Sequence, residues 1–291
     1  MYAITGITGK VGGALAANLL AAGRPVRAVV RDASKGVVWA ERGCEIALAD
    51  MNDRAALTAA FAGAEAAFIL PPSEFDPAPG YVQARETIDA IVAALTAGRP
   101  GKVLCLSTIG ADATQDNLLT QRTLLEQALS ALPIPVTFLR PGWFLENSLW
   151  DVASARDNGV IHSFLTPLDR PVPMVATKDI GTLAARLIQE NFTGQRVVEL
   201  EGPRRVSPND LAAAFAKALG HPVRAEIVPR EGWETMFRSQ GAKNPYPRIR
   251  MLDGFNEGWI EFADGGAKAL KGSTDVETVI AELVQREAVA A

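Results

Sequence analysis

Short apolar runs alternate with longer amphipathic stretches along the first half of the chain. The apolar runs, many of them rich in β-branched residues, predict strands at residues 2–5, 26–30, 45–49, 66–70, 103–107 and 135–139. The stretches between them are rich in Ala and Leu and predict helices at residues 11–22, 34–42, 53–62, 81–98 and 117–131. This alternation is typical of repeated βαβ units. We therefore expect an α/β fold with a doubly wound, parallel Rossmann sheet that carries helices on both faces.

The pattern becomes less regular after residue 149. Helices are predicted at residues 177–190 and 207–220, with a strand between them at 196–201. The second of these helices has a capping box formed by Ser207 and Asp210. We expect a Rossmann domain at residues 1–149, to which about 196–201 contribute a strand, and a smaller discontinuous C-terminal lobe that is mainly residues 150–291.

The segment 230–266 is expected to form loops and short helices over a pocket. It is rich in Gly, Trp, Phe and Arg. Within it, "MLDGFNEGWIEF" at 251–262 spaces its apolar groups irregularly and includes glycines, which favours a shaped wall over a regular core helix.

Composition narrows the classes of protein that fit. With 48% hydrophobic and 21% charged residues among 291, the chain resembles an ordinary globular protein. A net charge of -4 and a pI near 5.4 give no general attraction to nucleic acid or to a membrane surface. No apolar run approaches the roughly 18 residues of a membrane span, and no signal peptide is expected. Two cysteines, Cys44 and Cys105, are too few for a disulfide framework, so we expect a cytoplasmic protein.

The stretch "ITGITGKVGG" at residues 4–13 spaces Gly6, Gly9 and Gly12 three apart, between the first predicted strand and helix. Gly6 permits a tight turn, Gly9 lets the backbone approach a pyrophosphate, and Gly12 lets the helix pack close to the sheet. A glycine triplet alone often marks only a turn. Its place in a βαβ series favours a dinucleotide-binding loop.

The end of the second strand, "AVVRDAS", bears on which dinucleotide binds. Arg31 offers a planar, permanently charged fork to a 2'-phosphate, and Lys35 lies one helical turn beyond it. Asp32 could instead accept hydrogen bonds from the ribose of NAD, and either side chain could simply be solvated. Because Arg31 comes first, we expect NADP(H) to be preferred over NAD(H).

Several motifs together resemble the NmrA-like group of atypical short-chain dehydrogenase/reductases, nearest to its bacterial NAD(P)H:quinone reductases, azoreductases and dye reductases. They extend over almost the whole chain: "TGITGKVG" at 5–12, "VRAVVRD" at 26–32, "ALAD" at 47–50, "FILPPS" at 68–73, "LSTIGAD" at 106–112, "VTFLRPGWFLENS" at 136–148 and "KDIGTLAARLI" at 178–188. The same group also contains catalytically silent NADP sensors that regulate partner proteins.

The resemblance implies a set of cofactor-binding residues. It places Gly6, Thr8, Gly9, Lys10, Val11 and Gly12 around the pyrophosphate, Arg31 and Lys35 at the 2'-phosphate, Asp50 and Met51 by the adenine, Leu70, Pro71 and Pro72 along the nicotinamide, and Thr108 at the nicotinamide ribose. The crevice at the carboxyl ends of parallel strands selects the same positions.

The usual catalytic pair of short-chain dehydrogenases, Tyr-x-x-x-Lys on the helix after the fifth strand, is absent. That helix contains none of the three tyrosines. Tyr81 and Arg85 imitate the spacing but belong to the preceding helix. The resemblance places Arg122 where many relatives carry lysine. Arg122 could donate to the ribose or to a substrate oxygen, or it could be an exposed helix charge paired with Glu126, four residues on. Arg122 and Thr108 are the catalytic candidates.

Without a positioned acid, ketone and alcohol chemistry is disfavoured, because it moves a proton together with the hydride. Reduction of a quinone, azo compound or cationic dye can use water as the proton source. We therefore expect NADPH-dependent hydride transfer to an electron-poor planar small molecule. A silent NADP(H)-binding sensor is the alternative, and an isomerase or epimerase is weaker because it also needs an acid/base residue. A homodimer is compatible with the sequence.

Aromatic residues of the second half are the candidates for substrate binding. Trp143, Phe144 and Asn147 follow Arg140 and Pro141 in "RPGWFLEN". Aromatic rings there could stack on a flat substrate or simply pack in a core. Further candidates are His162, Trp233, Phe237 and Phe255, with Trp259 beside them. The two histidines are too sparse for a metal site, and His221 is expected to be a surface cap.

Overall fold

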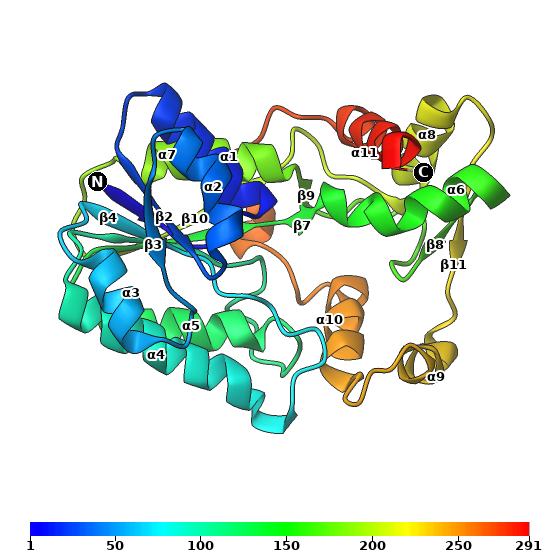
Figure 1. The fold of residues 1–291 in the computed structure, drawn as a ribbon. Helices are drawn as coiled ribbons and strands as arrows, with labels where there is room; N and C mark the ends of the chain where they lie inside the picture. Colours follow the sequence, from blue (N-terminus) through cyan, green and yellow to red (C-terminus); the bar gives the residue numbers. More distant parts are fainter. Residues whose placement is uncertain (291) are drawn as a thin grey trace. The chain divides into compact units, whose positions relative to one another are not determined.

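The computed structural model describes residues 1–290 and is built on a central eight-stranded sheet (Figure 1). The strand order is β12-β10-β6-β5-β4-β1-β2-β3. The strands in chain order are β1 (Tyr2–Ile4), β2 (Val26–Val30), β3 (Glu45–Leu48), β4 (Ala66–Ile69), β5 (Val103–Leu106), β6 (Val136–Pro141), β10 (Gln195–Glu201) and β12 (Leu270–Lys271). The strands pair in parallel, from β2 with β3 to β5 with β6 and β10 with β12. The expected parallel, doubly wound sheet is confirmed.

The chain divides into two compact units. Unit 1 comprises residues 1–112, 119–140 and 180–198, and unit 2 comprises 113–118, 141–179 and, within the described residues, 199–290. Unit 1 contains the strands from β1 to β5 and most of β6, and unit 2 contains the aromatic candidates. No helix within residues 1–290 combines the length and the apolar character that a membrane span requires.

Two layers of helices cover the sheet in unit 1. Figure 1 shows α1, α2 and α7 on one face and α3, α4 and α5 on the other. Their bounds are α1 (Lys10–Ala21), α2 (Ala33–Glu41), α3 (Arg54–Phe61), α4 (Val82–Gly98), α5 (Thr120–Ser130) and α7 (Thr177–Leu187). The helices α1 and α7 pack very closely, because a Cβ atom on Gly181 would lie 2.4 Å from Cβ of Ala14.

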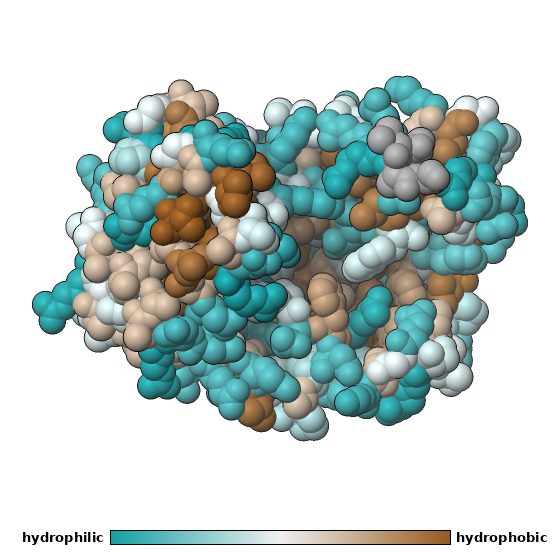
Figure 2. Space-filling model, viewed as in Figure 1, coloured by the Kyte–Doolittle hydropathy of each residue, from teal (hydrophilic) through white to brown (hydrophobic). Residues whose placement is uncertain are grey.

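One edge of the sheet carries exposed apolar side chains. The edge strand is β3, and Leu48 at its end is exposed, as are Val37 and Val38 on α2. Figure 2 shows apolar surface gathered over α2 and β3. These side chains therefore form surface of unit 1 and not core.

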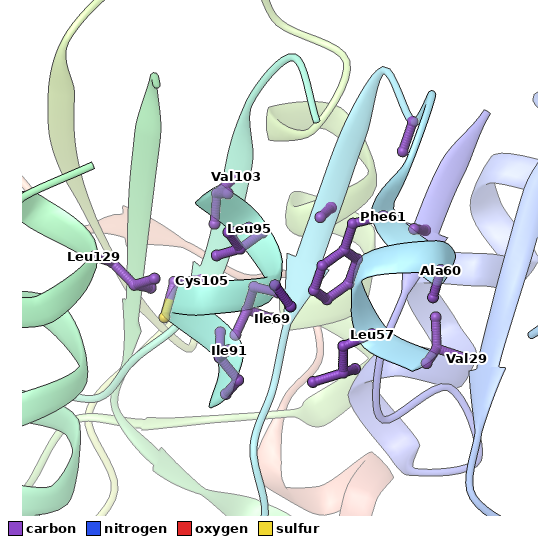
Figure 3. Packing of buried hydrophobic residues seen from close by; sticks show 14 of the residues in the cluster. Val29, Leu57, Ala60, Phe61, Ile69, Ile91, Leu95, Val103, Cys105 and Leu129 are labelled. Atoms are coloured by element: carbon purple, nitrogen blue, oxygen red, sulfur yellow. The ribbon is translucent and has the colours of Figure 1, made fainter. Parts of the chain in front are cut away.

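A core cluster lies between the sheet and α3, α4 and α5. Phe61 and Leu57 from α3 and Ile91 from α4 are fully buried against Ile69 and Cys105 of the strands (Figure 3). This apolar layer stabilises β1 and β4, the two strands beside the glycine loop, because burial of such side chains is the main stabilising term in folding.

Unit 2 combines short strands with helices. Its elements include β7 (Trp143–Phe144), the 3₁₀ segment η2 (Leu145–Asp151), α6 (Val152–Asn158), β8 (Val160–Ser163), β9 (Met174–Val175), α8 (Pro208–Leu219), β11 (Arg224–Ile227), α9 (Trp233–Ser239), α10 (Tyr246–Glu257) and α11 (Val276–Ala290). Helix α8 begins with the expected capping box of Ser207 and Asp210.

The expectation for residues 251–262 is wrong. Residues 251–257 belong to α10, a regular helix of 12 residues with Leu252 and Phe255 buried. Gly254 does not interrupt this helix. A Cβ atom at Gly254 would lie 2.6 Å from the ring of Trp259, so the glycine is required by packing.

Candidate functional site

The glycine loop makes a tight turn between β1 and α1. Gly6 has a φ of +62°, the left-handed region that favours glycine, and its carbonyl accepts a hydrogen bond from the Gly9 N–H at 3.0 Å. A Cβ atom on Gly12 would lie only 2.3 Å from the Gly6 oxygen. Two of the three glycines are therefore required by the loop itself.

Gly9 differs from the other two glycines. It is exposed and precedes α1 as the N-cap, and a Cβ atom there would meet only the Gly6 oxygen, at 3.3 Å. Neither a side-chain cap nor an acidic residue occupies the first turn of α1. The free N–H groups and the positive end of the helix dipole face an open surface, which fits a pyrophosphate.

The carboxyl ends of β1 and β4 meet beside this loop. Thr5 donates from Oγ1 to the Phe68 carbonyl at 2.9 Å and accepts from the Leu70 N–H at 2.9 Å. A Cβ atom on Gly6 would lie 3.1 Å from the Leu70 side chain. Leu70 is thus fixed next to the glycine loop, at the point where strand order reverses from β1-β2 to β1-β4 and where ligands bind in open α/β sheets.

The end of β2 presents two free cations. Arg31 and Lys35 are exposed, and their side chains make no hydrogen bond or ion pair with any residue in 1–290. Asp32 is the N-cap of α2, and its Oδ1 accepts from the Ser34 N–H at 2.9 Å and the Ser34 hydroxyl at 2.7 Å. These hydrogen bonds hold the pKa of Asp32 below its usual value. One oxygen of the carboxylate that could serve NAD is already engaged in capping.

Arg122 is attached to the segment that follows β4. Its Nη2 donates to the Pro71 carbonyl at 3.0 Å and to the Ser73 hydroxyl at 2.7 Å. The alternative prediction, an exposed arginine paired with Glu126, is wrong, because Arg122 is partly buried and Glu126 binds elsewhere. Burial lowers the pKa of Arg122, but its guanidinium remains a cation at neutral pH.

Glu126 takes part in a buried network at the ends of β5 and β6. Arg140 donates from Nε to Oε1 at 2.9 Å and from Nη2 to Oε2 at 2.6 Å. Ser107 donates to Glu126, and Asp112 accepts from Arg140 Nη1 at 2.7 Å. The sequence predicts no role for Arg140. The pattern of α5 does contain a signal that Glu126 is buried, because Glu126 lies on the same side of the helix as the apolar positions 125 and 129, which face the sheet.

The remaining cofactor candidates lie on the same unit. Thr8 and Lys10 are exposed in the loop and the first turn of α1, whereas Val11 is buried beneath them. Asp50 accepts from the Asn52 N–H at 2.9 Å, and Met51 packs partly buried on the core. Thr108 follows β5 and is partly exposed. These contacts do not test whether the residues bind a cofactor, so their cofactor roles stay predictions.

A pocket opens in unit 1 beside Arg122. It lies between α4, α5 and the segment after β4, and its lining residues are Pro71, Pro72, Glu74, Gln83, Ala84, Thr87, Ile88, Gln121 and Arg122. Gln121 closes one side by accepting from the Glu74 N–H at 3.2 Å and donating to the Glu74 carbonyl at 2.9 Å. The structure therefore brings Pro71, Pro72 and Arg122 together around one pocket, and their roles toward a cofactor or acceptor stay predictions.

None of the three tyrosines lies on α5, the helix where the usual catalytic tyrosine is expected. Tyr2 is buried, and burial together with its hydrogen bond to Glu65 raises its pKa to about 12. Tyr81 is buried at the start of α4 with a left-handed φ of 58°. Tyr246 is exposed on α10 in unit 2.

The substrate candidates all lie in unit 2, and those other than His162 fall into two groups. Trp143, Phe144 and Asn147 are partly exposed, and Trp143 packs edge-on against Phe255 at 5.2 Å. Trp233, Phe237 and Phe255 are at most 4% exposed and belong to apolar packing. The indole N–H of Trp233 donates to the Val228 carbonyl at 2.9 Å. Substrate contact by these residues stays a prediction, and for the buried group any effect on a ligand passes through other side chains.

The two histidines do not lie on the elements that carry these rings. His162 is exposed on β8, and His221 Nδ1 is 3.2 Å from the Pro222 carbonyl oxygen.

Two carboxylates of the family-like motifs have structural roles. Glu146 of "RPGWFLEN" accepts from the Thr177 N–H at 2.8 Å and also from the Thr177 hydroxyl, at the start of α7. Asp179 of "KDIG" accepts from the Thr274 N–H and hydroxyl, both at 2.8 Å. These side chains satisfy backbone donors, so the motifs encode folding as well as any site.

The family model described as the NmrA-like family matches residues 2–285. The chain belongs to this family. An NAD(P)H azoreductase of Xenophilus azovorans is 30% identical over 235 residues, which are 79% of this chain and 78% of the relative. Quinone oxidoreductase 2 of Escherichia coli is 30% identical over 83% of this chain and 82% of its own length.

Solved structures agree with this assignment. The NADPH-dependent quinone oxidoreductase of Escherichia coli, complexed with NADPH, superposes with a TM-score of 0.73 and 25% identity over 98% of this chain and 95% of that one. The Citrobacter sp. triphenylmethane reductase, complexed with NADP(H), has a TM-score of 0.79 over 97% and 99% of the two chains. At 20% identity the second likeness concerns the fold alone.

Proposed function

We propose that this protein is an NADPH-dependent reductase that transfers hydride to an electron-poor planar acceptor such as a quinone, an azo compound or a cationic dye. The observation that carries the proposal is the exposed surface at Gly9, where a Cβ atom would meet only the Gly6 oxygen, at 3.3 Å, and where glycine would let a pyrophosphate approach the backbone. The named relatives that use NAD(P)H support the same cofactor class.

Unit 1 supplies binding groups for each part of the cofactor. The N–H groups of the glycine loop and the first turn of α1 would hold the pyrophosphate, and Lys10 would add a charge beside it. Arg31 and Lys35 would hold the 2'-phosphate, because neither side chain has a partner in the described part of the chain and Asp32 is engaged in capping α2. Leu70, Pro71 and Pro72 would lie along the nicotinamide.

The reaction needs little from the protein besides positioning. Bound NADPH supplies a hydride, and a quinone that gains this hydride and one proton from water becomes a hydroquinone. Arg122 would fix the Pro71–Ser73 segment and present its remaining N–H groups to a ribose or acceptor oxygen. An acceptor that needs no enzyme acid fits a site whose helix α5 contains no tyrosine.

The test is NADPH oxidation, followed at 340 nm as in routine dehydrogenase assays, with a panel of quinones, azo dyes and triphenylmethane dyes. Acceptor-dependent oxidation is the expected result. Calorimetric titration with NADPH and NADP+ accompanies it. Tight cofactor binding with no turnover on any acceptor would favour the silent sensor, which the missing tyrosine also supports. If neither NADPH nor NADP+ bound, the cofactor site itself would be rejected.

A further inference from the structure

Three arginines of unit 2 lie over aromatic rings, and one of them has no counter-charge. Arg230 lies 5.1 Å from the Trp233 ring centroid and Arg250 lies 5.5 Å from that of Trp259. Both donate to the carboxylate of Asp253, Arg230 at 2.6 Å and Arg250 at 3.1 Å. Arg248 lies closest to its ring, 4.2 Å from the centroid of Phe237.

The side chain of Arg248 makes no hydrogen bond and no ion pair with any residue of 1–290. It is nevertheless partly buried, and this burial lowers its pKa. No acidic residue occurs in the first turn of α10, where Arg248 lies. Within residues 1–290, the buried side-chain nitrogen or oxygen atom that lacks a hydrogen-bond partner is Nη2 of Arg196, so the guanidinium nitrogens of Arg248 stay open to solvent and to a ligand.

The ring beneath Arg248 is rigidly held. Phe237 is 1% exposed and stacks on Phe164 at 5.5 Å, and Phe164 packs edge-on against Trp233 at 5.6 Å. The guanidinium therefore lies on a fixed apolar platform with its N–H edge unused. A planar fork held in this way is suited to a carboxylate, sulfonate or phosphate, which it can bind through two parallel hydrogen bonds.

We propose that Arg248 is a specificity residue that binds an anionic substituent of the acceptor, so that the preferred substrates are conjugated compounds carrying a carboxylate, sulfonate or phosphate group. The proposal rests on the reductase function proposed above. It also explains how a buried aromatic cluster can influence a ligand, since Phe237 positions Arg248 and Arg248 contacts the anion.

The test compares 1,4-naphthoquinone with 1,2-naphthoquinone-4-sulfonate in the wild type, Arg248→Gln and Arg224→Gln. Arg224 is an exposed arginine of the same unit that pairs with Glu226 on the surface, so it is the matched loss of charge. Arg248→Gln should lower kcat/KM for the sulfonated quinone about 10- to 100-fold. It should change the value for the neutral quinone less than about threefold, and Arg224→Gln should leave both unchanged. An equal loss on both quinones, or no loss on the sulfonated one, would overturn the proposal.

Calorimetric binding of the sulfonated quinone to the protein saturated with NADP+ separates this proposal from the reductase function. If no acceptor is turned over, the reductase proposal fails, and weaker sulfonate binding by Arg248→Gln than by Arg224→Gln still supports the anion site. Equal sulfonate binding by the two variants would reject the anion site. The melting temperature of Arg248→Gln should fall by a few degrees at most, because the side chain loses its contact with the Phe237 ring but no hydrogen bond. A marked fall would assign Arg248 a structural role and count against the proposal.

Discussion

Arg140 and Glu126 face each other through two hydrogen bonds, from Nε to Oε1 at 2.9 Å and from Nη2 to Oε2 at 2.6 Å, with both side chains about one-tenth exposed. The pair joins the end of β6 to α5. Because α5 also carries Arg122, this pair holds the helix that presents the catalytic candidate.

Glu126→Gln should lower the free energy of unfolding by about 3 kcal/mol, because removal of one partner leaves a buried charge poorly compensated. Asp112 retains part of the compensation through its contact with Arg140. Urea unfolding measures the effect, and Glu86→Gln on the exposed face of α4 is the control, expected to stay within about 0.5 kcal/mol. An unchanged unfolding midpoint for Glu126→Gln would show that the pair contributes nothing.

Gly9→Ala and Gly12→Ala should separate binding from folding. At Gly12 the new Cβ atom would lie 2.3 Å from the Gly6 oxygen, so the loop must shift and stability should fall by about 1–3 kcal/mol. At Gly9 the nearest atom is 3.3 Å away, so the fold should persist while NADPH affinity falls at least about tenfold. Thermal unfolding and calorimetric titration measure the two effects. Normal NADPH binding by Gly9→Ala would contradict the proposed approach of the pyrophosphate.

Arg31→Ala should weaken NADPH binding by about 1.5–3 kcal/mol, or roughly 10- to 100-fold, because it removes a charge-assisted contact to the 2'-phosphate. NADH binding should change less than about threefold, since NADH lacks that phosphate. Arg186→Ala, on the exposed side of α7, removes the same charge and is the control. Equal losses for both cofactors would remove the basis for an NADP(H) preference.

Arg122→Ala should lower kcat for acceptor reduction roughly 10- to 100-fold, because the Pro71 carbonyl and the Ser73 hydroxyl lose their shared donor. Ser73→Ala removes only the second of these contacts and should cost less than about fivefold. Steady-state kinetics with saturating NADPH measures both. If Arg122→Ala alters only stability and leaves kcat unchanged, Arg122 is a structural residue and not a catalytic one.

Asp151 makes the stability of the protein depend on pH, and the sign of this dependence follows from the burial of its carboxylate. Its carboxylate has no hydrogen-bond partner within residues 1–290, and burial raises its pKa from 3.8 to about 6. The folded protein therefore binds a proton more tightly than the unfolded chain, and this contribution to stability is full below pH 3.8 and declines as the pH rises to about 6.

Asp151→Asn should accordingly raise the free energy of unfolding by about 1–2 kcal/mol at pH 7 and by little at pH 4. Urea unfolding at the two pH values measures the difference. Asp157→Asn, at an exposed position of α6, should show no such gain. A gain of equal size at both pH values would point to a cause other than the charge of Asp151.

The fold of unit 1 is predictable from the sequence because its signals are local. The strands lie within two residues of the predicted bounds and the helices within three. Apolar runs such as 26–30 and 103–107 are buried on both faces and bounded by turns, so periodicity and length are sufficient. The glycine spacing predicts the loop for the same reason.

Helix α10 is not predictable in this way. Pro245, Pro247 and Gly254 all argue against a helix, yet Pro247 lies in the first turn, where its missing N–H costs nothing. Gly254 is demanded by the ring of Trp259, a contact that no local pattern encodes. The partner of Glu126 escaped prediction for a related reason. The spacing of four residues suggested Arg122 as the partner of Glu126. The helix instead directs Glu126 toward β6, where it binds Arg140, which lies 14 residues further along the chain.

Both cysteines are shielded from thiol reagents in the folded chain. Cys105 is fully buried in the sheet, where its pKa rises to about 12, and Cys44 is 7% exposed with a pKa also raised by burial. Since only the thiolate reacts, alkylation of either residue must await an opening of the structure. The rate at which the two native cysteines are alkylated therefore reports the opening of the folded structure. A single cysteine introduced on the surface could be labelled without first removing these two.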